Sequence, residues 1–155
     1  MPVVVTNRQD ICERMIKQNI AIYNPEHCRT IAETWLFTVD LWREQTIVLL
    51  GDTIYPNDVI KDILEDDPYM QMYGNSAEIF SCSFDEGYHQ TLMNTLFETN
   101  RDTWKAATWE IYRHWCGFPY DSGKKETKFL KIIPNTADID APYQYEDVIK
   151  GKAYE

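Results

Sequence analysis

The stretch from residue 24 to residue 42 repeats apolar side chains at the spacing of an α-helix, and this repeat limits the possible folds more than any other feature. Asn24 and Pro25 are typical of the first positions of a helix. At about 100° per residue, the apolar side chains that follow share one arc of about 140°. They are Cys28, Ile31, Ala32, Trp35, Leu36, Val39 and Trp42. We predict a long amphipathic helix whose arc packs into the core.

A second apolar group lies on the opposite side of the same predicted helix. Phe37 and Leu41 are one helical turn apart. The residues around them are charged, as expected on the surface of a helix, and they are Arg29, Glu33, Asp40 and Glu44. We therefore expect Phe37 and Leu41 to be covered by a protein partner.

The rest of the chain favours more helices and little β structure. Helical spacing recurs in residues 7–21, 57–65 and 103–116 and in the stretch after Asp85. We interpret the apolar run 47–50 as the end of a helix, because Gly51 follows it. Alternation predicts a short strand at 80–84, and a strand at 128–133 could pair with it. The predicted fold is mainly α: a bundle of four to five helices with a minor β element. Residues 1–118 would form the helical body and residues 119–155 an extended C-terminal arm with one possible strand.

Acidic residues are concentrated in the middle of the chain. The net charge is -10, and residues 51–102 contain eleven acids and two basic residues. The chain lacks a basic footprint, which argues against direct nucleic-acid binding. The densest acidic group is Asp58, Asp62, Glu65, Asp66 and Asp67. This group is either a solvated surface or a surface that docks on a basic partner by imitating the charge of nucleic acid.

The segment 66–75 is predicted to be a long loop with two tyrosines and two methionines beside acidic residues. Its aromatic and apolar side chains could form a recognition loop. They could equally fold back onto the core, and the sequence does not decide between these alternatives.

Histidine and cysteine lie close together in residues 113–120, but this stretch is better explained as a helix end. Gly117 suits the left-handed conformation that follows a helix, and Pro119 cannot continue one. The four cysteines have no paired spacing, which favours free thiols over a zinc site or a disulfide framework. No common catalytic or phosphate-binding motif occurs. We therefore expect no enzyme activity, catalytic residue, metal or cofactor, with a thiol or metal-dependent enzyme as a minor alternative.

The C-terminal arm contributes three further candidate contact residues, Tyr143, Tyr145 and Tyr154. A helical body with an aromatic arm suits a non-enzymatic structural subunit of a homo- or hetero-oligomer, for example a connector-type component of a viral particle. Because no run of 18 apolar residues or export signal occurs, we expect a protein of the cytoplasm, or of a virion assembled there, without membrane contact. The alternative function is an acidic inhibitor, or nucleic-acid charge mimic, that occupies a basic site on a partner protein.

Overall fold

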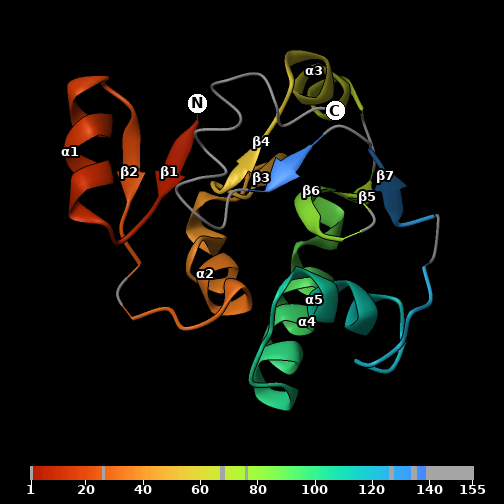
Figure 1. Cartoon of the computed structure of the whole chain (residues 1–155). Helices are drawn as coiled ribbons and strands as arrows, with labels where there is room; N and C mark the ends of the chain where they lie inside the picture. Colours follow the sequence, from red (N-terminus) through yellow and green to blue (C-terminus); the bar gives the residue numbers. More distant parts are fainter. Residues whose placement is uncertain are drawn as a thin grey trace.

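A four-stranded sheet forms the centre of the molecule (Figure 1). The computed structural model describes residues 2–25, 27–66, 69–75, 77–125, 128–133 and 136–138. The strands of the central sheet lie in the order β3 (Gln45–Leu49), β6 (Ile79–Asp85), β5 (Met70–Gly74) and β7 (Leu130–Ile132). β6 runs antiparallel to β3 and β5, whereas β7 runs parallel to β5. With a neighbour on each side, β6 is buried along almost its whole length.

Helices cover both faces of the central sheet. On one face, the core that includes Met72 and Cys82 also contains residues of α2 (Ile31–Phe37), α4 (His89–Asp102) and α5 (Thr108–Trp115). On the other face, α3 (Asn57–Glu65) packs with Tyr73 and Phe80. Met72 and Tyr73 are consecutive in β5, so their side chains point to opposite faces of the sheet. Because Met72 packs with α2, α4 and α5 and Tyr73 packs with α3, these two groups of helices lie on opposite sides of the sheet. The result is a three-layer arrangement (Figure 1).

An irregularity in the pairing of β5 with β6 decides which face Phe80 covers. Gly74 pairs with Ile79, out of step with the rest of the ladder, and this leaves an extra residue in β6. A bulge of this kind reverses the alternation of side chains beyond it. Phe80 consequently packs with α3, whereas Cys82 and Phe84 pack with the three helices on the opposite face.

Two small sheets accompany the central one. The first is a parallel pair made by β1 (Val3–Val5) and β2 (Ala21–Tyr23), which are connected through α1 (Gln9–Lys17). The second is an antiparallel pair of β4 (Thr53–Ile54) and β8 (Ala137–Asp138). Two short 3-10 helices, η1 (Val39–Leu41) and η2 (Glu86–Tyr88), complete the described elements.

The predicted fold class, a mainly α bundle with a minor β element, is wrong because the protein has a mixed α/β fold. The apolar run 47–50 belongs mostly to strand β3 rather than to the end of a helix. A short apolar run is compatible with either element when periodicity alone is considered. The segment 66–75 is not a long loop either, because it contains β5, in which Met70, Met72 and Tyr73 are buried. Both methionines and Tyr73 therefore fold back onto the core, whereas Tyr69 is 74% exposed.

The long helix predicted over residues 24–42 is much shorter in the structure. α2 begins after Thr30 and ends at Phe37, and η1 follows it. Residue His27 has a φ of 64°, which is incompatible with a continuous helix at that position. The helix predicted over 7–21 is also shortened to α1, because β2 begins at Ala21, and the helix predicted over 103–116 is reduced to α5.

Two local predictions are confirmed. The helix predicted over residues 57–65 is α3, with the same bounds. The helix end near Gly117 is also present, since this glycine has a φ of 70° and donates its N–H to the carbonyl of His114 at 3.0 Å. The next amide, of Phe118, donates to the carbonyl of Arg113 at 2.8 Å, which completes the left-handed C-terminal cap.

Candidate functional site

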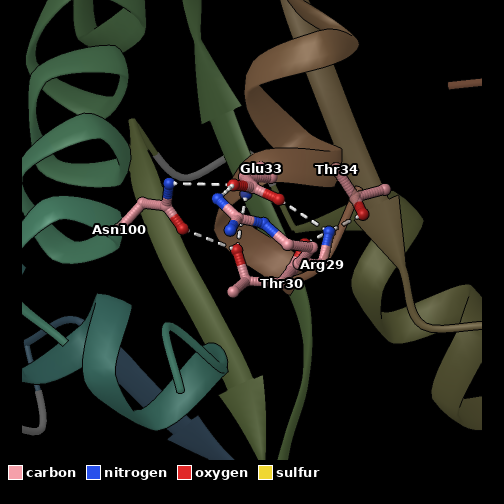
Figure 2. Close-up of polar contacts among 5 residues, drawn as sticks. All are labelled: Arg29, Thr30, Glu33, Thr34 and Asn100. Carbon is pink, nitrogen blue, oxygen red and sulfur yellow. Dashed lines mark hydrogen bonds and ion pairs between the residues drawn. The ribbon is translucent and has the colours of Figure 1, made fainter. Parts of the chain in front are cut away.

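A polar cluster fixes the start of α2 against α4 (Figure 2). Thr30 caps α2, since its side-chain oxygen accepts the N–H of Glu33 at 3.1 Å and its hydroxyl donates to Asn100 Oδ1 at 2.8 Å. The Glu33 carboxylate accepts the backbone N–H of Arg29 at 2.6 Å, the Arg29 guanidinium at 3.0 Å and the Asn100 amide at 3.2 Å. These bonds, led by the one from the Arg29 N–H, lower the pKa of Glu33 to about 2. The cluster is a structural clamp between two helices.

The clamp sets how α2 and α4 lie relative to each other. Thr30, before α2, contacts Asn100 near the end of α4, whereas the ring of Trp42, beyond α2, lies 5.2 Å from that of His89 at the start of α4. The two helices therefore run antiparallel. Phe37 lies one helical turn after Glu33, so it is on the same side of α2 as the clamp. Because the two helices run antiparallel, Phe37 is also nearer than the clamp to the start of α4.

Two exposed phenylalanines result from this arrangement. Phe37 is 50% exposed, as the sequence predicted for a surface position, and Phe97 of α4 is 61% exposed. Phe97 precedes Asn100 by three residues, which places it on the same side of α4 as the clamp. We call Phe37 and Phe97 the helix-face pair. The helical spacing after Asp85 does not single out Phe97, but its position about 140° around α4 from the buried Leu92 is a signal that it lies at the edge of the apolar stripe.

The other predicted contact residues have different environments. Leu41 lies in η1, where it is half-buried and lines a groove between β1 and β3. It does not form one helical face with Phe37, because α2 ends between them. Tyr143, Tyr145 and Tyr154 lie outside the described residues. Of the predicted arm, residues 130–132 form the sheet strand β7.

The predicted acidic surface is only partly brought together. Asp58, Asp62 and Glu65 lie on α3, and the Glu65 carboxylate is 3.8 Å from Lys61. Asp66 accepts a hydrogen bond from Lys131 of β7 at 2.9 Å, so its charge is paired. Asp67 lies outside the described residues. Other acids of the 51–102 segment lie on α4, on the opposite side of the sheet from α3, and they do not join the α3 group.

His114 is held between a carboxylate and a phenol. Its Nε2 lies 2.9 Å from Glu98 Oε2 and its Nδ1 lies 2.9 Å from the hydroxyl of Tyr120. The two rings stack at 6.1 Å between centroids. These contacts join α4, α5 and the turn that follows Gly117. Their evident effect is to hold these three segments together.

The thiol of Cys82, in strand β6, is not an activated nucleophile. Cys82 is fully buried, and burial raises the pKa of its thiol, which opposes formation of the thiolate. Its Sγ lies 3.8 Å from the sulfur of Met70. Within the part of the chain that the structure describes, no group of three or more metal-ligating side chains gathers, and no helix is long and apolar enough to cross a membrane.

No protein-family model matches this chain, and no curated protein matches it significantly.

Proposed function

We propose that this protein is a non-enzymatic structural subunit that binds other copies of itself, or a related neighbour, through the helix-face pair. The observation that carries this proposal is the exposure of Phe37 and Phe97 on two antiparallel helices that the Glu33 clamp holds in place. Exposed apolar side chains that lie on the same side of two packed helices commonly mark a protein interface. A cytoplasmic location, or a place in a virion assembled there, is part of the same proposal.

The alternative, an acidic inhibitor of a basic site, has weaker support. Asp66 is paired with Lys131, and the acids of the middle of the chain are divided between two sides of the sheet. A charge mimic needs its carboxylates gathered on one surface, and α3 alone contributes only part of them. The predicted arm contacts Tyr143, Tyr145 and Tyr154 stay a prediction.

The test is the mass of the full chain in solution, measured by size-exclusion chromatography with light scattering. We expect an oligomer that the double variant Phe37→Ser with Phe97→Ser converts to a monomer, because apolar anchors of an interface commonly contribute about 2 kcal/mol or more each. The matched control is Ile16→Ser with Leu64→Ser, which removes two other exposed apolar side chains, 65% and 61% exposed, from α1 and α3. A monomeric wild-type chain, or equal loss of mass in both double variants, would contradict the proposal.

A further inference from the structure

A groove of about 710 Å³ separates β1 from β3. It is lined by every residue from Pro2 to Val5 and by every residue from Gln45 to Leu50. Side chains alternate between the two faces of a strand, so a groove that touches consecutive residues lies against the strand's edge. We call this groove the strand slot, because a strand edge forms each of its two long walls.

The backbone of β3 directs hydrogen-bonding groups into the strand slot. Leu50 donates its N–H to the carbonyl of Phe80 at 2.9 Å, on the side that faces β6. In an antiparallel pair only alternate residues bond to the partner strand, so Val48 also bonds to β6. The N–H and C=O groups of Ile47 and Leu49 therefore point away from β6 and toward the slot.

The backbone of β1 does the same from the opposite wall. Thr6 donates its N–H to the carbonyl of Tyr23 at 3.0 Å, on the side that faces β2. Alternate residues of a strand direct their backbone groups to the same side, so Val4 faces β2. The backbone groups of Val3 and Val5 then face the slot. Among the described residues, β2 is the only strand that pairs with β1, and β6 is the only one that pairs with β3.

The side chains of these strands are also less buried than their sequence suggests. Three consecutive valines, Val3–Val5, are typical of a parallel strand buried on both faces, yet all three are only half-buried. Leu49 of β3 is 42% exposed. Two strands alone are marginally stable in water, and parallel strands normally occur inside larger sheets. β1 and β2 therefore have the character of an incomplete sheet.

We propose that the strand slot accepts an extended, neutral, apolar segment of a partner polypeptide, which pairs with β1 on one side and with β3 on the other. The added strand would join the two-stranded and four-stranded sheets into one sheet in the order β2-β1-partner-β3-β6-β5-β7. The side chains of such a strand would face Trp35 of α2 on one side and Tyr55 on the other, since both residues line the slot. Backbone pairing supplies the affinity, and these walls select apolar side chains.

The charge of the slot identifies the kind of segment that fits. Arg43 is the one charged residue among the described residues that line it, and its guanidinium already donates to the carbonyls of Asp40 and Trp42. The chain's own residues 139–155 match poorly, because the neutral stretch 141–145 contains Pro142, which has no N–H to donate, and the stretch that follows it begins with the adjacent Glu146 and Asp147. In a strand they would point to opposite faces, so one carboxylate would be buried whichever face is chosen. A neutral segment from a partner has no such cost.

This inference shares with the proposed function only the need for a protein partner. Phe37 and Phe97 do not line the strand slot. Loss of the helix-face pair should therefore change the mass of the assembly without changing binding at the slot, and the two proposals can fail separately.

The test is the exchange of backbone amide hydrogens in the full chain, measured by NMR with two synthetic probe peptides. One is the blocked neutral hexapeptide Thr-Val-Val-Ile-Val-Thr, and the other has the sequence of residues 141–149. We expect the neutral peptide to slow exchange at Val3, Val5, Ile47 and Leu49 by at least about tenfold, because paired amides exchange more slowly. The 141–149 peptide should have little effect.

Two variants at one position separate backbone pairing from side-chain packing. Leu49→Pro removes an N–H that faces the slot and leaves the bonds to β6 in place, whereas Leu49→Ala shortens the same side chain and keeps the N–H. We expect Leu49→Pro to abolish protection at Ile47 and Leu49→Ala to retain most of it. If Leu49→Pro does not fold, the neutral peptide methylated at alternate amide nitrogens tests the same bonds, and it should not protect Ile47.

Three results would overturn the inference. The first is no protection of the four amides by the neutral peptide. The second is equal protection by an alternately methylated peptide, which would show that backbone pairing is not involved. The third is protection by the 141–149 peptide, or protection already present in the full chain alone, which would assign the slot to the chain's own C-terminal segment or to that of a second copy.

Discussion

Replacing Glu33 by glutamine should destabilise the protein at neutral pH and have little effect in acid. Glu33 is 15% exposed, and its carboxylate accepts hydrogen bonds from Arg29 and Asn100. Glutamine preserves the size of the side chain but carries no charge. The bonds to the Arg29 N–H and guanidinium would therefore be weakened or lost, and α2 would be held less firmly against α4.

The expected size of this effect follows from the pKa of Glu33, which is lowered from 4.5 to about 2. The whole shift would correspond to about 3 kcal/mol, but Arg29 is largely exposed and its charge is screened by water. We therefore expect a loss of about 1 to 2 kcal/mol in the free energy of unfolding at pH 7. Because the pKa is lower in the folded state, this stabilisation is complete above about pH 5 and disappears as the pH falls toward 2.

The assay is urea unfolding followed by tryptophan fluorescence at pH 7 and pH 3. The difference between wild type and Glu33→Gln should be smaller at pH 3 than at pH 7. Glu65→Gln is the control, since Glu65 is an exposed partner of Lys61 at 3.8 Å, and its replacement should change stability by less than about 0.5 kcal/mol. Equal stability of wild type and Glu33→Gln at pH 7, or a difference that does not shrink in acid, would refute this reasoning.

Three further predictions concern single positions. Thr30→Ala removes the cap of α2 and should cost about 1 kcal/mol in urea unfolding at pH 7, and an unchanged midpoint would contradict the cap. Gly74→Ala would place a Cβ 2.5 Å from the carbonyl oxygen of Glu78, so we expect a loss of about 1 to 3 kcal/mol, and wild-type stability would show that the bulge tolerates a side chain. Cys82 should react with iodoacetamide only after denaturant is added, as judged by mass spectrometry of peptides, and labelling at the rate of the partly exposed Cys12 would disprove its burial.

The sequence predicted local features better than it predicted the arrangement of the sheet. α3 and the helix end at Gly117 depend on residues that are close in the chain, and both were predicted correctly. β3 and β5 depend on pairing with β6, so their short apolar runs could not be distinguished from helical or loop segments. The bulge opposite Gly74 was also beyond prediction, because it is a property of two paired strands.

The candidate sites also combine features that depend on residues close in the chain with features that depend on how distant segments pack. The exposure of Phe37 followed from its place among charged residues, but its relation to Phe97 requires the antiparallel packing of α2 on α4. The strand slot left only a weak signal in the sequence. Three consecutive valines at Val3–Val5 are typical of a strand, but no strand was predicted there, and only the structure locates the open edge of β3 across from them.

The most direct test of the central claim is sedimentation equilibrium of the unmodified full chain at low and high salt. The account holds that apolar contacts through Phe37 and Phe97 assemble the protein, and such contacts are not weakened by screening of charge. It predicts an oligomer whose association is equal or stronger at 0.5 M sodium chloride than at 0.05 M. A monomer at both salt concentrations, or an oligomer that dissociates as salt is added, would contradict the account.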